Sequence, residues 1–326
     1  MRRSAAARFL SVFVLAAATL VGVLASPGLA QAGSSSTKTT GPHTKKAVVY
    51  YLSLGDSYSV GYQPGLGATA GFTAYVAKKT KMQLENFGCG GATTTSILTV
   101  VGCTSPYGPP AATDAVSYPT ETQEQAAVGF IAANPGHVGL ITVSIGGNDV
   151  TACASASNPV SCVAAATTNI QTNVTALVAA LNGALTSAGD TSAKLIGLTY
   201  PDVILGDYVY PPGAPNTTLA NESISAFDLL VNPALHTAYT SVPEGSFVNV
   251  TSAPYKKATT GDDTGSTSSV SPTPGDVTTK LKPYGVIPVA VWEVCQLTYY
   301  CSQGNIHANT KGYKFIGRLA VTDFDS

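Results

Sequence analysis

"AVVYYLSLGDS", residues 47–57, is a β-branched and aromatic run that ends abruptly in Gly55, Asp56 and Ser57. A nearly continuous apolar run is typical of a strand that is buried on both faces, as in a parallel sheet. Glycine at a strand end permits backbone angles that other residues avoid, so the turn can present the next side chain at the sheet edge. Ser57 is therefore a candidate functional residue, and an ordinary Gly/Asp/Ser turn is the alternative.

The rest of the chain alternates between two periodicities. Four further apolar runs are predicted as strands, at 82–87, 138–145, 193–200 and 246–250. Four segments carry apolar residues at intervals of three and four, which predicts helices at 71–80, 121–134, 164–189 and 219–242. This alternation predicts a three-layer α/β/α sandwich with a central, mostly parallel five-stranded sheet. Function is then expected at the carboxyl ends of the strands.

The N-terminus is expected to be a targeting segment. Three arginines precede an apolar stretch at 9–24 and then small residues, so residues 1–32 are predicted as a secretory signal peptide and 33–46 as a flexible lead-in. A single domain is expected over 47–326, with a mobile Ser/Thr/Gly/Pro-rich loop at about 259–279. We expect a secreted, extracellular protein without a transmembrane anchor after signal removal.

Charge excludes one class of partner. Without residues 1–32 the chain has 14 Lys and Arg against 18 Asp and Glu, with no basic cluster. Nucleic-acid binding needs clustered Lys and Arg to neutralise phosphates, so no nucleic-acid partner is expected. A monomer acting on a small-molecule or lipid ester is expected instead.

All six cysteines lie after the predicted signal peptide and fall into three near-neighbour couples. An even number in an oxidising compartment favours disulfides over metal ligation. The sequence permits 15 connectivities. The spacing favours the pairs Cys89–Cys103, Cys153–Cys162 and Cys295–Cys301.

Four short blocks follow the strands or lie near the end of the chain. They are the Gly-Asp-Ser turn, "GCGGATTTS" (88–96), "GGNDV" (146–150) and "NIHANTKGY" (305–313). A histidine within hydrogen-bond reach activates a serine hydroxyl, and His307 is the candidate base for Ser57. The tetrahedral oxyanion of acyl transfer needs preorganised donors. The Ser57 and Gly91 N–H groups and the Asn148 side-chain amide are the candidates.

This set of blocks resembles the GDSL, or SGNH, hydrolases among secreted esterases and lipases. Gly55-Asp56-Ser57, Gly91, Gly146-Gly147-Asn148-Asp149 and His307 occur in the family's order, with Tyr58 where many relatives have leucine. The resemblance implies a flavodoxin-like sandwich with Ser57 and His307 as catalytic residues. The disulfides and the export signal resemble the extracellular actinobacterial branch.

One position departs from the family pattern. Many relatives carry an aspartate three residues before the histidine, where this chain has Gly304. We expect the Gly304 backbone carbonyl to orient the imidazole in a Ser-His dyad. A distant acid such as Asp114 or Asp202, completing a triad, is the alternative.

The sequence thus predicts a carboxylic ester hydrolase, an esterase or lipase acting on lipid or short-to-medium acyl esters through an acyl-enzyme. No cofactor or metal is expected. A carbohydrate acetylesterase is the alternative enzyme, and a catalytically inactive exported binding protein on the same fold is the alternative of another class.

Overall fold

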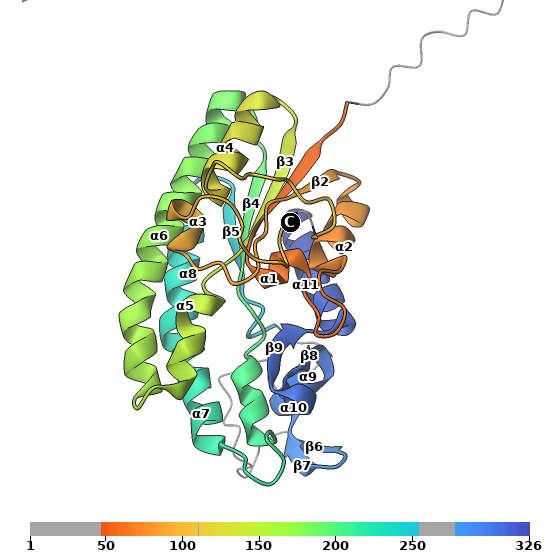
Figure 1. Ribbon diagram of the computed structural model, residues 1–326, viewed down its shortest axis with the longest axis vertical. Coiled ribbons are helices and arrows are strands. Elements are labelled where there is room, and N and C mark those ends of the chain that lie inside the picture. The colour runs from red at the N-terminus through yellow and green to blue at the C-terminus, as the bar shows by residue number, and fades with distance from the viewer. Residues whose placement is uncertain (1–46, 110, 254–277) are drawn as a thin grey trace, which may run out of the picture. The chain divides into compact units, whose positions relative to one another are not determined.

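The structure is a computed structural model that describes residues 47–109, 111–253 and 278–326 (Figure 1). These residues belong to one compact unit, Lys46–Ser326. The predicted signal peptide, the lead-in and all but the last two residues of the 259–279 loop lie outside the described residues. No helix within the described ranges is long and apolar enough to span a membrane.

Five parallel strands form the central sheet in the order β2-β1-β3-β4-β5. They are β1 (Tyr50–Gly55), β2 (Gln83–Asn86), β3 (Val138–Ser144), β4 (Lys194–Leu198) and β5 (Gly245–Val248). Each lies within or one residue beyond a predicted strand, and the sheet is wholly rather than mostly parallel. The carboxyl ends of its strands face the lower part of Figure 1, where the chain continues into α1 (Ser57–Val60).

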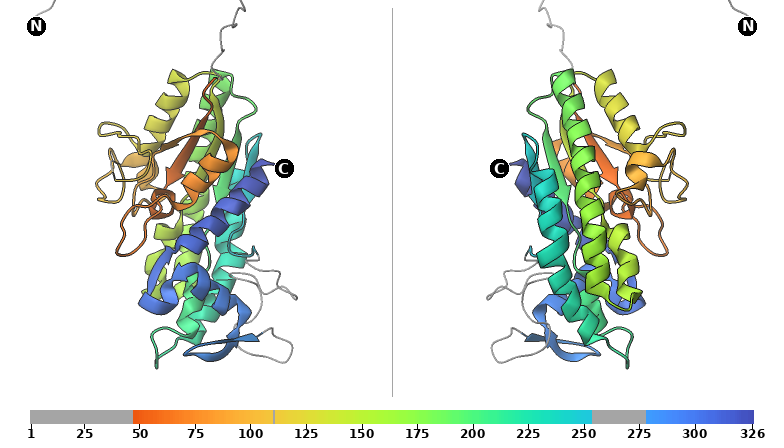
Figure 2. Two further views of the ribbon diagram at one scale, coloured as in Figure 1. Left: turned by 90° about the vertical axis from the view of Figure 1, so that its right-hand side faces the viewer. Right: turned by 90° about the vertical axis from the view of Figure 1, so that its left-hand side faces the viewer.

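Helices cover both faces of the sheet, as Figures 1 and 2 show. One layer contains α4 (Gln123–Ala133), α6 (Pro159–Ala188) and α8 (Asn232–Tyr239), with α3 (Ser96–Thr99) beside α4. The other contains α2 (Gly71–Thr80) and α11 (Thr310–Phe324). Each layer has its own buried cluster, represented by Ile131, Leu177 and Leu235 on the first face and by Phe72 and Ile316 on the second. The predicted three-layer sandwich is therefore confirmed.

An additional layer of short elements extends beyond the carboxyl edge of the sheet, at the bottom of Figure 1. It contains η2 (Val203–Tyr208), α7 (Thr217–Ala226), α9 (Val289–Leu297), α10 (Tyr300–Gln303) and two antiparallel hairpins. The hairpins pair β6 (Thr278–Leu281) with β7 (Gly285–Pro288) and β8 (Thr298–Tyr299) with β9 (Asn305–Ala308). A separate buried cluster that includes Leu205, Ile224 and Val291 holds much of this layer together.

The single helix expected at 219–242 is interrupted. Between α7 and α8 lies one turn of π-helix, η3 (Phe227–Val231). Pro233 follows within α8 and has no N–H to donate to the carbonyl of Leu229, so the regular α-helical bond is missing there. Single π-turns of this kind occur often at functional sites.

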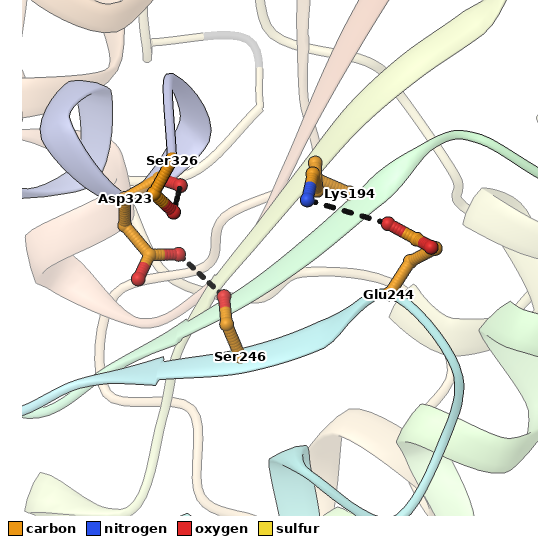
Figure 3. Close-up of polar contacts among 5 residues, drawn as sticks. All are labelled: Lys194, Glu244, Ser246, Asp323 and Ser326. Atoms are coloured by element: carbon orange, nitrogen blue, oxygen red, sulfur yellow. Dashed lines mark hydrogen bonds and ion pairs between the residues drawn. The ribbon is translucent and has the colours of Figure 1, made fainter.

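The opposite edge of the sheet carries polar contacts that are remote from these elements (Figure 3). Lys194 and Glu244 form an ion pair of 3.3 Å between the amino ends of β4 and β5. The Ser246 hydroxyl donates to the Asp323 carboxylate and so joins β5 to α11. An exposed ion pair contributes little stability. These contacts join elements at the amino ends of the strands, away from the carboxyl edge.

Candidate active site

The turn after β1 requires a glycine. Gly55 has a φ of +134°, and a Cβ there would lie 2.0 Å from the carbonyl oxygen of Ser144 on β3. The Gln123 side chain accepts from the Gly55 N–H at 2.6 Å and donates to its carbonyl at 3.1 Å. The backbone is thereby fixed just before Ser57, which begins α1 and is buried except for 8% of its surface.

Ser57 and His307 are brought together from opposite ends of the described chain. His307 lies on β9, and its Nε2 is 2.8 Å from the Ser57 Oγ. This distance is within the range of a hydrogen bond between a nucleophile and its base. The predicted pairing of these two residues is therefore present in the geometry.

Asn305 contacts the other ring nitrogen of His307. Its Oδ1 lies 2.8 Å from Nδ1 and also accepts the backbone N–H of His307 at 3.1 Å. A backbone N–H can only donate, so the atom facing it must be the amide oxygen. Nδ1 then carries the hydrogen, which leaves the Nε2 lone pair free to accept the Ser57 hydroxyl proton.

The expected orientation by the Gly304 carbonyl is corrected by this contact. Gly304 ends α10 in the left-handed conformation, and its N–H donates to the Tyr300 carbonyl. The chain enters β9 directly afterwards, which places the Asn305 side chain, one residue later, against the ring. Neither alternative acid takes this position in the part of the chain that the structure describes, since the Asp202 carboxylate accepts from Ser223 and Asp114 lies beside β2, where it lines a separate hollow with Gln83 and Glu85.

Aromatic side chains surround the imidazole. The Tyr62 ring meets it edge-on with 4.5 Å between centroids, and the Tyr58 ring stacks at 6.0 Å. The Tyr58 hydroxyl also donates to the carbonyl of Ile306 at 2.7 Å, so the residue after Ser57 holds the residue before His307. Burial lowers the pKa of His307 from 6.5 to about 4. The ring is therefore neutral at neutral pH.

Two backbone donors at the site have no acceptor among the described residues. They are the N–H groups of Ser57, which is the first residue of α1, and of Gly91. Gly91 has a φ of +81°, and a Cβ there would meet open space, so its backbone angle rather than crowding favours glycine. Unpaired donors beside a nucleophile are suited to binding an oxyanion.

The third expected donor, Asn148, is more constrained. It lies on α5 (Gly147–Thr151), and its Nδ2 donates to the Ala92 carbonyl at 2.8 Å and to the Asp56 carboxyl at 3.3 Å. The first contact joins the "GGNDV" block to the glycine block. The second is long, so its hydrogen is the one that a ligand can compete for.

Asp56 is a buried carboxyl directly before Ser57. It accepts from the Tyr58 N–H at 2.9 Å and from the Tyr200 hydroxyl at 2.6 Å. Burial outweighs these bonds and raises its pKa from 3.8 to about 7. Its contacts fix the turn and the Asn148 amide, so a structural role fits it better than acid catalysis.

A second carboxylate anchors the glycine block. Asp149 accepts from the Thr94 N–H at 2.9 Å and from the Thr94 hydroxyl at 2.6 Å. Asn173 of α6 donates to the same hydroxyl. The contact joins the "GGNDV" block to the glycine block.

An apolar pocket opens beside Ser57. The space inside it is about 850 Å³ when the open mouth and the adjoining solvent are included. Ser57 and Asn148 lie among its lining residues, and its walls come from α5, η1 (Ala152–Ser155), the start of α6, η2, α7 and η3. Most of these lining side chains are aliphatic or aromatic, and Asp56 and Glu222 are the charged ones.

Three disulfides join the cysteines in the expected couples, Cys89–Cys103, Cys153–Cys162 and Cys295–Cys301. The first lies two residues before Gly91. The second contributes Cys153 directly to the pocket wall. The third closes the chain between α9 and α10, shortly before β9.

Sequence reasoning missed Asn305 and Tyr200. Asn305 stands two residues before His307, outside the family's usual spacing for the orienting acid. An Asn-x-His pattern at the start of a strand is the signal that could have indicated it. Tyr200 follows β4, and its position at the carboxyl edge could have indicated a contact with the residues after β1.

No curated protein matches this chain. Among solved structures, phospholipase A1 from Streptomyces albidoflavus NA297 is 17% identical, with 62% of this chain and 79% of that chain covered and a TM-score of 0.40. The lipase Lip_vut3 from a goat rumen metagenome is 16% identical, with 85% and 97% covered and a TM-score of 0.48. A GDSL-like lipase from Bacteroides thetaiotaomicron is 11% identical, with 85% and 87% covered and a TM-score of 0.37.

A family model provides the assignment. The GDSL-like lipase/acylhydrolase model matches residues 51–320, which span every block described above. This chain belongs to the GDSL-like lipase/acylhydrolase family.

Proposed function

We propose that this protein is a secreted carboxylic ester hydrolase, an esterase or lipase that works through an acyl-enzyme on Ser57. The observation that carries the proposal is the 2.8 Å contact of the Ser57 Oγ with His307 Nε2 at the mouth of an apolar pocket. A nucleophile, a base in the required tautomer and a space for an acyl chain are thus adjacent.

In the first half-reaction the Ser57 Oγ attacks the ester carbonyl carbon, and its proton passes to His307 Nε2. The C–O bond to the alcohol then breaks, and His307 returns the proton to the departing oxygen. In the second half-reaction water attacks the acyl carbon and gives a proton to His307. The bond between that carbon and the Ser57 Oγ then breaks, His307 returns the proton to the Ser57 Oγ, and the carboxylic acid leaves. Asn305 keeps Nδ1 protonated and the ring in place throughout.

The oxyanion of each tetrahedral intermediate is stabilised by the unpaired N–H groups of Ser57 and Gly91. Asn148 contributes its amide hydrogen by exchanging the long contact with Asp56 for the oxyanion. Its shorter bond to the Ala92 carbonyl keeps the amide aimed at the site.

The pocket favours an acyl chain over a sugar. Its lining is aliphatic along α6, η2 and η3, with residues such as Val163, Ile204 and Val231. Each methylene buried there contributes about 0.8 kcal/mol of binding. A carbohydrate acetylesterase would need a shallow polar cleft, so lipid or medium-chain acyl esters are the proposed substrates.

Asn305 also counts against the alternative that this chain is a catalytically inactive binding protein. That alternative rested on the missing acid before His307, and the amide oxygen of Asn305 supplies a partner for the ring. The proposal includes removal of the predicted signal peptide and secretion as a monomer. Its three disulfides are typical of an oxidising compartment.

Hydrolysis of p-nitrophenyl esters from acetate to palmitate tests the proposal, together with labelling by a fluorophosphonate. We expect labelling of wild type and loss of both labelling and hydrolysis in Ser57→Ala. Ser302→Ala, at an exposed serine on α10, is the matched control and should keep both. Wild-type protein that neither labels nor hydrolyses any ester of the series would contradict the proposal.

A further inference from the structure

We propose that Tyr62 and Tyr107 form a second subsite, which binds the alcohol half of the ester and is suited to an alcohol that carries an aromatic ring. The inference rests on the proposed function, because it concerns the group that leaves when Ser57 is acylated. It adds a selectivity for the alcohol that the acyl pocket cannot provide.

The position of His307 determines where the alcohol must lie. The histidine returns its proton to the departing oxygen, so the alcohol leaves beside Nε2. The ring of Tyr62 lies edge-on against this imidazole, with centroids 4.5 Å apart. The ring of Tyr107 lies 4.4 Å from that of Tyr62 at an interplanar angle of 50°. The two tyrosines thus extend from the imidazole as a continuous aromatic surface.

The acyl pocket does not include this surface. Ser57, Asn148 and Ile306 line the pocket, whereas neither Tyr62 nor Tyr107 does. The two halves of an ester bound at Ser57 therefore meet different surroundings. The acyl chain enters the aliphatic pocket, and the alcohol faces the tyrosine pair.

The backbone holds Tyr62 rigidly beside the nucleophile. Its N–H donates to the carbonyl of Ser57 at 2.9 Å, and its own carbonyl accepts from the Tyr313 hydroxyl at 2.8 Å. With its backbone fixed and its ring packed between His307 and Tyr107, Tyr62 loses little conformational entropy when a ligand packs against it.

Tyr107 is tied to the glycine block. The Cys89–Cys103 disulfide joins its loop to the segment before Gly91. A Cβ on Gly90 would lie 3.2 Å from the Tyr107 Cβ, so the loop packs closely on the oxyanion side of the site. Even so, 40% of the Tyr107 surface is exposed. The Tyr107 side chain is thus held on this side of the site with part of its surface free to contact a ligand.

The chemistry of the two rings indicates the class of alcohol. Aromatic rings pack favourably against one another in tilted and offset arrangements with centroids 4.5 to 7 Å apart. A third ring, carried by the alcohol, can extend the Tyr62–Tyr107 pair in the same manner. A short alkyl alcohol has too little surface to reach Tyr107.

The test compares hexanoate esters of benzyl alcohol, cyclohexylmethanol and ethanol. The first two alcohols have similar size and are both primary, so their comparison isolates the aromatic ring. We expect wild type to prefer the benzyl ester over the cyclohexylmethyl ester in kcat/KM. In Tyr107→Ala the ratio of kcat/KM for benzyl over ethyl ester should fall about fivefold. Tyr107→Phe should retain the ratio.

Val101→Ala is the matched control, because Val101 is 54% exposed in the same loop and has no ring. Its ratio should equal that of wild type. An unchanged ratio in Tyr107→Ala, or equal rates for the benzyl and cyclohexylmethyl esters in wild type, would overturn the subsite. If wild type hydrolyses none of the three esters and resists fluorophosphonate labelling, the proposed function itself fails. The two failures are therefore distinguishable.

Discussion

Asn305 gives His307 a neutral partner where an aspartate would give a charged one. The amide oxygen fixes the tautomer as a carboxylate would, since it accepts the Nδ1 hydrogen at 2.8 Å. It cannot stabilise the imidazolium that forms during catalysis by a full opposite charge. Burial therefore dominates, and the pKa of His307 lies at about 4.

Asn305→Asp should raise the pKa of His307, because a carboxylate beside the ring favours its protonated form. The base must be neutral to act, and its neutral fraction falls as the pH drops through its pKa. The acid limb of kcat/KM should lie near pH 4 in wild type and at higher pH in the variant. A pH–rate profile with a soluble ester measures the acid limb of each protein. Identical limbs would show that position 305 does not act on the ring.

Tyr58→Phe tests the link between the nucleophile and the base. The change removes only the hydroxyl that donates to the Ile306 carbonyl, next to His307. One lost hydrogen bond of about 1 kcal/mol should lower kcat about fivefold while KM changes little. Tyr51→Phe, which removes a buried hydroxyl bonded to Thr142 away from the site, is the control. It should lower the melting temperature without changing kcat, and an equal fall in kcat in both variants would contradict a positioning role.

The elements of the sheet could be predicted because their apolar runs are long and their ends carry glycine. β1 and β3 are buried on both faces, and Gly55 and Gly146 occupy positions with positive φ two residues before Ser57 and Asn148. The hairpins β6–β7 and β8–β9 were not predicted, because their strands of two to four residues lie outside the alternation of strands and helices that identified the equally short β2 and β5. Asn305 was missed for the same reason, because its role depends on how β9 begins after α10.

Helix α6 forms one wall of the pocket, which makes its first turns the place to test acyl-chain length. Val163 is 7% exposed and lines the pocket. Val163→Phe should fill part of this space and lower the ratio of kcat/KM for palmitate over acetate p-nitrophenyl esters about tenfold. A tenfold change is about 1.4 kcal/mol, which one to two displaced methylenes at about 0.8 kcal/mol each would account for. The ester series measures it directly.

The neighbouring exposed residue offers a matched control. Ala164→Phe adds a larger side chain to the same turn of α6 but on its solvent side. It should leave the chain-length profile unchanged. A profile that shifts equally in both variants would mean that α6 affects selectivity without contacting the acyl chain.

The active site forms where the sheet meets the layer beyond its carboxyl edge. The sheet supplies Ser57 and Asn148 through the turns after β1 and β3, and the outer layer supplies His307 on β9. Hydrogen bonds join the two parts near the site, among them those that the Tyr299 hydroxyl donates to the Gln63 side chain at 3.0 Å and the Tyr58 hydroxyl donates to the Ile306 carbonyl at 2.7 Å. Correct docking of the outer layer is therefore a condition for activity as well as for stability.

Asp202 lies at this junction and makes the stability of the fold depend on pH. Its carboxyl is fully buried after β4, with one oxygen accepting from the Ser223 hydroxyl and the other without a partner in the described ranges. Burial raises its pKa from 3.8 to about 7. Between these values the folded protein keeps a proton that the unfolded chain has released. Its contribution to stability is therefore greatest below pH 4 and is lost as the pH rises toward 7.

Asp202→Asn removes this titration and keeps a side chain of similar shape. The melting temperature of the variant relative to wild type should therefore increase between about pH 5 and about pH 8. Asp325→Asn, at an exposed carboxylate near the C-terminus, should show no such trend. Thermal unfolding at several pH values measures both variants. A melting-temperature difference for Asp202→Asn that stays constant with pH would mean that Asp202 is ionised in the folded protein throughout this range, and its burial would then have to be compensated by a partner other than Ser223.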